Sequence, residues 1–300
     1  MRRRAKPGGA KLRANKFIKP QIGWLSYQIQ LKPSLEWGLV CLNSPPEDVD
    51  ERLGAVYWSF LSALNVNKNI TKEVRCLPEM FQGLGMFNLN VDGLGARIHF
   101  LKHNWGLNTA AGHLLRHAYE VFQMEVGLDG NIFTRDYDKL EYLSSHSWFK
   151  ATWALCWRFR VNIRISAEND IPPSRDGDYS ITEALLNNGS FGKHSIMVLK
   201  RICRFKKVHS MADIVRCDGK TVDPSVLDNR EGNSTRIFSR EKPRPTDVAN
   251  LWATAIRRIT SPDLILGTPL GKHLREPPGH QRWFSSMDES TLFHELEEDR

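Results

Sequence analysis

A tight turn followed by an amphipathic helix occupies residues 77–101 and restricts the local fold more than any other part of the sequence. Pro78 stops a helix from running through the residues before it, because its ring clashes with the preceding turn. Gly83 and Gly85 allow positive φ where the chain reverses. Beyond the turn, apolar side chains recur on one face of a helix predicted from about residue 91 to 103. The segment therefore predicts a strand, a tight turn and a helix, in that order.

Helical periodicity recurs on both sides of this turn. Residues 47–64 start with acidic side chains, which suit a helix N-terminus, and continue with apolar residues at three- and four-residue steps. Asn108 or Thr109 can cap a further helix that runs to Val126 and that Gly127 ends. Helices are also predicted over residues 147–159, 180–187, 193–206 and 247–259.

Strand signals are few. Residues 158–165 alternate between basic or polar and apolar side chains, which predicts a strand. Residues 211–215 can pair with residues 221–222 across Asp218-Gly219, which is a hairpin turn signal. Residues 21–42 alternate loosely and fit either a strand or a short helix. We therefore predict a mainly α fold, a helical bundle with a few short strands or hairpins.

The composition excludes several classes of protein. A chain of 300 residues with 41% hydrophobic residues, 9 Trp and 14 Phe can bury a substantial core, which argues against global disorder. No apolar run approaches the roughly 20 residues that a membrane helix needs, and no signal peptide pattern opens the chain. The five cysteines are scattered, odd in number and never in a Cys-x-x-Cys pair. This usage predicts reduced thiols in an intracellular protein of the nucleus or cytoplasm.

The positive charge is concentrated at the N-terminus. Residues 1–35 contain nine Lys or Arg and no acid, whereas the rest of the chain has 33 basic and 34 acidic residues. Such an arm suits a polyanion, because each neutralised phosphate releases counterions. A solvated tail without a specific partner is the alternative. The predicted nucleic-acid contacts in the arm are Arg2, Arg3, Arg4, Lys6, Lys11, Arg13, Lys16 and Lys19.

Residues 193–209 form a second basic segment. On a helix, Ile196, Leu199, Ile202 and Cys203 would face inward, and Lys200, Arg201 and Arg204 would face solvent. The predicted contacts here are Lys200, Arg201, Arg204, Lys206 and Lys207.

A third basic surface is expected from Arg158, Arg160 and Arg164, which would share one face of the predicted strand. All three basic surfaces can equally be the solvated faces of amphipathic elements. Trp148, Trp153 and Trp157 are expected to belong to a core rather than to a base-stacking platform.

The segment from Leu77-Pro78 through Gly83-Leu84-Gly85 into a helix resembles the region just beyond the polymerase core of retrotransposon-type reverse transcriptases. Gln82 stands where that family commonly has a second glycine. Weaker matches follow in the family's order: residues 211–214 with Asp218-Gly219, Trp252, residues 266–271, and Trp283-Phe284 with Asp288. The resemblance extends over residues from about 20 to 295.

The resemblance implies a thumb and post-polymerase region, in which the helices of a full-length polymerase grip the template–primer duplex. The expected organisation is a flexible basic arm over residues 1–20, a helical thumb-like region over 21–130, a second helical region with short strands over 131–260 and an irregular segment over 261–300. A polymerase needs paired carboxylates to hold two metal ions, and this chain contains no Asp-Asp pair. If the resemblance holds, the chain begins after the catalytic centre and cannot polymerise by itself.

We expect no catalytic residue, no metal and no cofactor. The histidine pairs His99 with His103 and His113 with His117 each share a helix face, but no cysteine or following glutamate completes a metal site. The expected function is sequence-nonspecific binding to the backbone of RNA or DNA, with no membrane partner. The alternative is a protein-interaction or scaffold module that does not bind nucleic acid.

Overall fold

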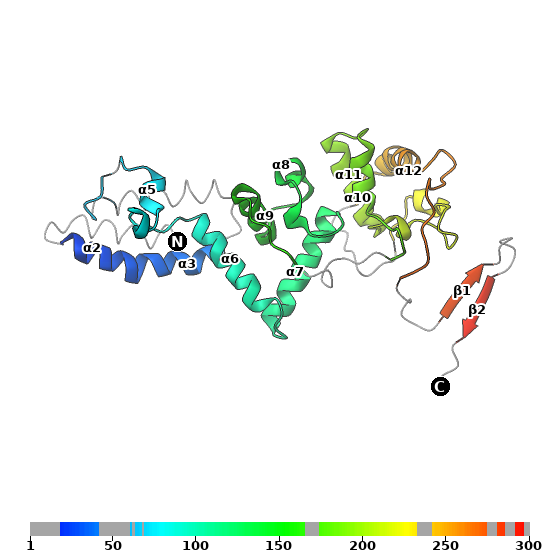
Figure 1. The fold of residues 1–300 in the computed structure, drawn as a ribbon. Helices are drawn as coiled ribbons and strands as arrows, with labels where there is room; N and C mark the ends of the chain where they lie inside the picture. Colours follow the sequence, from blue (N-terminus) through cyan, green and yellow to red (C-terminus); the bar gives the residue numbers. More distant parts are fainter. Residues whose placement is uncertain are drawn as a thin grey trace. The chain divides into compact units, whose positions relative to one another are not determined.

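The computed structural model describes residues 19–41, 61, 64–67, 69–165, 174–232, 242–274, 281–285 and 292–296. Over these ranges the fold is mainly α, as predicted, with short helices joined by tight turns and a β-hairpin close to the C-terminus (Figure 1). The chain divides into two compact units. Unit 1 comprises residues 1–119 and 133–164, and unit 2 comprises residues 120–132 and 165–300.

The first described helix of unit 1 runs without a break. It consists of α2 (Pro20–Ser26), the π-helical segment η1 (Tyr27–Leu31) and α3 (Lys32–Cys41). The helical alternative for this region is therefore confirmed over residues 21–41, and the strand alternative is wrong. The predicted helix over residues 47–64 lies almost entirely outside the described residues.

A short helix, not a strand, precedes the turn after residue 77, and the turn folds back onto that helix. The short helix α5 (Lys72–Cys76) is followed by one 3₁₀ turn, η2 (Glu79–Phe81). The backbone N–H groups of Leu84 and Met86 then donate to the carbonyls of Val74 and Arg75, at 3.1 and 2.9 Å. The predicted strand is wrong, because the end of α5 takes up the hydrogen bonds that a strand partner would have made.

Two residues of this turn have a left-handed backbone, and a third has no room for a side chain. Gly85 and Gln82 adopt left-handed φ angles of 58° and 62°. Gly83 does not, but a Cβ atom there would lie 1.9 Å from the carbonyl oxygen of Leu77. Glycine is thus required at Gly83 by the close approach of the backbone. At Gln82, where the resembled family commonly has glycine, the left-handed backbone costs a modest amount of conformational free energy.

The turn is tied to the first helix through a buried phenol. The hydroxyl oxygen of Tyr27 accepts a hydrogen bond of 2.7 Å from the backbone N–H of Phe87. Tyr27 and Phe87 belong to an apolar cluster that also includes Leu31, Leu35 and Met86. The residues after the glycines therefore anchor the turn against the helix over residues 20–41.

The remaining predicted helices of this half are confirmed. They are α6 (Val91–Asn104), α7 (Ala110–Val126) and α9 (Trp148–Phe159), and between the last two lie η3 (Ile132–Thr134), α8 (Tyr137–Leu140) and η4 (Glu141–Leu143). Thr109 accepts a hydrogen bond from the N–H of Gly112, Ser147 caps α9, and Gly127 ends α7 with a φ of 74°.

A buried arginine joins α6 to α9. The Arg97 guanidinium donates to Thr152 Oγ1 at 2.9 Å and to the carbonyl of Trp148 at 3.2 Å. Burial lowers the pKa of Arg97 to about 10. Beside this contact lies an aromatic cluster in which Tyr119 meets both Phe133 and Phe149. These contacts form the core of unit 1 around α9.

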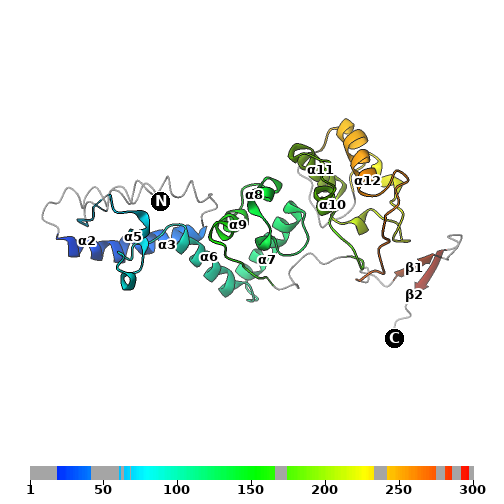
Figure 2. The ribbon, with the colours of Figure 1, turned by 45° about the horizontal axis from the view of Figure 1, so that its top comes forward.

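Unit 2 is built on three neighbouring helices. α10 (Ile181–Asn188) packs against α11 (Lys193–Lys206) and α12 (Ala253–Ile259), and the π-helical segment η8 (Asp247–Trp252) leads directly into α12 (Figures 1 and 2). Two 3₁₀ turns, η6 (Met211–Asp213) and η7 (Pro224–Leu227), also lie in the described part of unit 2. The predicted helices over residues 180–187, 193–206 and 247–259 are confirmed.

The strands of the structure differ from those predicted from the sequence. The expected hairpin is reduced to one antiparallel bridge between Val215 and Val222, since η6 occupies most of its first arm. The last segment, expected to be irregular, instead contains the antiparallel strands β1 (Gln281–Ser285) and β2 (Leu292–Leu296), with Trp283 opposite His294. Aromatic residues such as Trp283 and Phe284 favour strands.

All five cysteines lie in the described part of the chain, and each is a free thiol. None of the helices in the described ranges combines the length and apolar character needed to cross a membrane.

Candidate nucleic-acid interface

The basic segment on α11 is only partly available to a ligand. Ile196, Leu199, Ile202 and Cys203 are buried, as predicted. Lys200 and Lys206, however, are also buried, so the prediction that Lys200 faces solvent is wrong and burial argues against both lysines as phosphate contacts. Both ammonium groups donate to backbone carbonyls: Lys200 to Glu125, and Lys206 to Asp228 and Arg230.

These lysines have structural roles that explain their burial. Glu125 lies in the last turn of α7, where carbonyls have no partner within the helix, so Lys200 acts as a side-chain cap for that helix end. Lys206 satisfies carbonyls of the loop after η7, and burial lowers the pKa of Lys206. Helical periodicity cannot reveal such acceptors, because they come from distant segments.

The other basic residues of this segment differ in exposure. Arg201 is exposed, Arg204 is half-buried, and Lys207 forms an ion pair with Glu231 at 3.5 Å. Of the arm, Lys19 is exposed directly before α2. The remaining arm residues, Arg2, Arg3, Arg4, Lys6, Lys11, Arg13 and Lys16, lie outside the described residues.

A matched pair of variants tests this division of α11. We expect Lys200→Met to lower the free energy of unfolding by about 1–3 kcal/mol, because the Glu125 carbonyl loses its donor. We expect Arg201→Gln to change stability by no more than about 0.5 kcal/mol but to weaken binding to a nucleic-acid duplex severalfold. Chemical denaturation and fluorescence anisotropy measure the two effects. Equal losses of binding in both variants would contradict the division.

The basic residues after residue 157 do not form a strand. Arg158 lies in the last turn of α9, Arg160 adopts a left-handed φ of 54°, and residues 161–165 have no regular secondary structure. The N–H of Val161 donates to the carbonyl of Cys156 at 2.9 Å, which is the helix-ending pattern that usually has glycine at the position of Arg160. The strand prediction is wrong because this helix end consumes the first residues of the alternating pattern.

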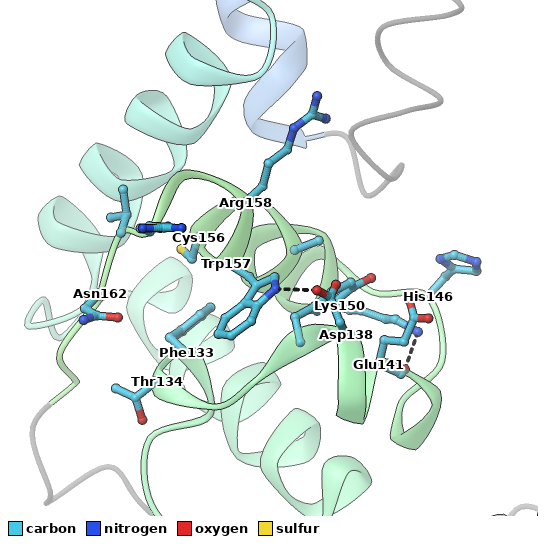
Figure 3. A pocket seen from close by; sticks show the side chains of 14 residues that line it. Phe133, Thr134, Asp138, Glu141, His146, Lys150, Cys156, Trp157, Arg158 and Asn162 are labelled. Carbon is cyan, nitrogen blue, oxygen red and sulfur yellow. Dashed lines mark hydrogen bonds between the residues drawn. The ribbon is translucent and has the colours of Figure 1, made fainter. Parts of the chain in front are cut away.

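A pocket of about 1090 Å³ lies beside this helix end, within unit 1. Its lining comes from η3, α8, η4, α9 and the residues that follow α9. Figure 3 shows the Trp157 indole in the middle of the lining, with Phe133 on one side of it and Asp138 on the other, whereas Arg158 points away from the indole. Arg160 and Asn162 complete the end of the pocket formed after α9.

Trp157 is not a core residue. Its side chain is 39% exposed, whereas Trp153, one turn earlier, is fully buried. The expectation of a tryptophan core is thus confirmed for Trp153 and wrong for Trp157. Trp157 could have been distinguished from Trp153 by its position in the last turn of the helix. It lies next to Arg158 and close to Arg160, which are both exposed.

Hydrogen bonds fix the polar side of the pocket. Trp157 Nε1 donates to Asp138 Oδ2 at 2.9 Å (Figure 3). Lys150 Nζ donates to the carbonyls of Glu141 and Ser144 at 2.6 and 2.9 Å, so this cation fastens η4 to α9. Burial raises the pKa of Cys156, which also lines the pocket, to about 12, so its thiol stays protonated at neutral pH and is a poor nucleophile.

No group of three or more His, Cys, Asp or Glu side chains within the described ranges could hold a metal ion. The imidazoles of His99 and His103 stack with their centroids 6.3 Å apart, on the exposed side of α6.

No family model, no curated protein and no solved structure matches this chain.

Proposed function

We propose that this chain is a non-catalytic nucleic-acid-binding protein similar to the post-catalytic region of a retroelement reverse transcriptase. It binds the phosphate backbone of RNA or DNA without sequence specificity, through its N-terminal arm and through arginines at the surface of both units. The observation that carries the proposal is the charge separation, since nine cations and no acid occupy the first 35 residues. A stretch of this kind attracts polyanions wherever it lies.

Exposed arginines on the described surface support the same partner. Arg158 and Arg160 lie at the end of α9, and Arg201 lies on the outer side of α11. Arg258 adds a cation at the end of α12, with its guanidinium 5.4 Å from the centre of the Phe191 ring. Guanidinium groups suit phosphate because they present several donors in one plane. The surface can therefore continue the electrostatic attraction that the arm begins.

The turn over residues 77–86 supports the ancestry. Its two glycines are required by geometry, Gly85 by a positive φ and Gly83 by the nearby Leu77 carbonyl. Gln82, the one departure from the resembled pattern, retains the left-handed conformation that a glycine would adopt there. The free thiols agree with a reducing compartment, and we place the protein in the nucleus or cytoplasm.

Neutralising the arm tests the proposal. We expect neutralisation of the arm to weaken binding of the full-length chain to a labelled duplex at least about tenfold at low salt, because fewer counterions are released on binding. The variant has Gln at Arg2, Arg3, Arg4, Lys6, Lys11, Arg13 and Lys16. Fluorescence anisotropy gives the affinity. The control is a variant with Gln at seven exposed cations of unit 2, namely Lys193, Lys220, Lys242, Lys272, Arg216, Arg230 and Arg244. An unchanged affinity would rule out the arm as a binding element.

A second candidate function rests on an exposed apolar row. Ile22, Leu25 and Ile29 are each more than half exposed and follow three- and four-residue steps along α2 and η1. Such a row favours a protein-interaction module, because monomers rarely leave contiguous apolar faces in water. Under this candidate, the chain binds no nucleic acid at low salt, and Leu25→Asp abolishes a protein–protein association measurable by sedimentation.

A further inference from the structure

We propose that the pocket beside Trp157 binds an unpaired nucleobase, so that the protein prefers single-stranded to double-stranded nucleic acid. The inference rests on the proposed function and deepens it, because it assigns the bound form of the nucleic acid. Its basis is the coincidence, within one part of unit 1, of an open cavity, an exposed indole and two arginines.

The pocket has the size and lining for such a ligand. Small-molecule sites usually measure about 300–1,000 Å³ and combine apolar walls with a few placed polar groups. This pocket of about 1090 Å³ is slightly larger than that range. Phe133, Tyr137 and Trp157 supply aromatic surface, while Thr134 and Asn162 supply groups that can form hydrogen bonds. A pocket with this lining matches a nucleobase, which is flat, apolar on its faces and polar at its edges.

The indole of Trp157 is held in place before any ligand arrives. Its Nε1–H is bonded to Asp138, and the ring lies in the pocket lining rather than in the core (Figure 3). A fixed aromatic side chain loses little conformational entropy when a base stacks on it. Every nucleobase has such a face, so stacking provides affinity without sequence specificity.

The charges of the pocket lining indicate on which side of the indole the nucleic-acid backbone would lie. Asp138 and Glu141 lie on one side of the indole and repel phosphate, whereas Arg158, which points away from the indole, and Arg160 belong to the part of the lining where the chain leaves α9 (Figure 3). The backbone is therefore expected on the arginine side, with the base directed toward Trp157. One carboxylate oxygen of Asp138 accepts the indole N–H, and the other oxygen can accept a hydrogen bond from a base N–H.

Duplexes cannot use this site without losing base stacking. In a duplex both faces of each base are covered by neighbours, and exposing one face costs unstacking energy. The backbone contacts of the arm and of Arg201 need no exposed base, so both forms can make them. The preference for single strands should consequently depend on Trp157 alone among the exposed aromatic residues described here.

The test uses the full chain and three labelled ligands of one sequence, about 12 units long: single-stranded RNA, single-stranded DNA and the DNA duplex. At low salt we expect both single strands to bind more tightly than the duplex. Trp157→Ala should weaken single-strand binding about tenfold and leave duplex binding within about twofold. The difference between the RNA and DNA arms shows which single strand is the better ligand.

Two further variants keep the test independent of folding. Trp157→Phe retains an aromatic face, so single-strand affinity should stay within about threefold. The part of the tryptophan fluorescence quenching that comes from Trp157 should be lost, so the bound strand should quench the remaining tryptophans less. Arg160→Gly suits the left-handed φ of this residue, so it should fold at least as well while binding every ligand more weakly. Unchanged quenching in Trp157→Phe would overturn the pocket assignment.

The outcomes separate this inference from the proposed function. Equal binding of single strands and duplex, unaffected by Trp157→Ala, would overturn the base pocket and leave backbone binding intact. Absence of binding to all three ligands by the unaltered chain would overturn the proposed function itself, and the pocket assignment with it.

Discussion

Replacing Trp153 with alanine is expected to lower the free energy of unfolding of unit 1 by about 3–5 kcal/mol. The side chain is fully buried, meets Tyr137 edge-to-face at 5.0 Å between ring centres, and donates its Nε1–H to the carbonyl of Arg135 at 3.0 Å. Truncation therefore opens a large cavity and also leaves a carbonyl without its donor. Chemical denaturation followed by far-UV circular dichroism measures the loss.

Trp157→Ala is the matched control for this prediction, because it removes the same side chain one turn later on α9. Since Trp157 is 39% exposed, its truncation should cost clearly less than that of Trp153. Equal destabilisation by the two variants would show that Trp157 belongs to the core and would remove the exposed platform from which the base pocket is argued.

Gly83→Ala is expected to have the second largest effect, a loss of about 3 kcal/mol, at the upper end of what overpacking costs. Its Cβ would lie 1.9 Å from the carbonyl oxygen and 2.4 Å from the carbonyl carbon of Leu77, and backbone cannot rotate aside as a side chain can. The turn must therefore open, which also breaks its hydrogen bonds to α5. The thermal unfolding midpoint provides the measurement.

Gly95→Ala in α6 serves as the control for Gly83→Ala. Nothing lies within 4 Å of a Cβ at Gly95, and alanine is the better helix former by about 1 kcal/mol. This variant should raise the unfolding midpoint, so the two Gly→Ala substitutions should move stability in opposite directions. A tolerated alanine at position 83 would contradict the closure of the turn described here.

Local signals in the sequence were sufficient for the longer helices after residue 90, but not for the short helices α5 and α8. The apolar spacing on α11 and the caps Thr109 and Ser147 lie within a few residues of the elements they define, so one sequence carries their physics. The turn glycines are local too, although their requirements differ. Gly85 needs a positive φ, which sequence rules anticipate, whereas Gly83 is required by a carbonyl six residues earlier.

The candidate site depended on contacts that the sequence does not encode locally. The apolar spacing of α11 predicts that Lys200 faces solvent, yet a carbonyl 75 residues earlier in the chain holds its ammonium group in the interior. Trp157 was assigned to the core because it is a tryptophan on an amphipathic helix. Its exposure follows from the helix ending at Phe159, which the alternating pattern after residue 158 concealed.

The central claim is that this protein binds the phosphate backbone of nucleic acids, and salt dependence tests it most directly. The dissociation constant of the full chain for a duplex should be measured by anisotropy between about 50 and 200 mM monovalent salt. If five or more phosphates are neutralised, the logarithm of the association constant should fall against the logarithm of salt with a slope of about −4 or steeper. A slope near zero, or no binding at the lowest salt, would contradict the account.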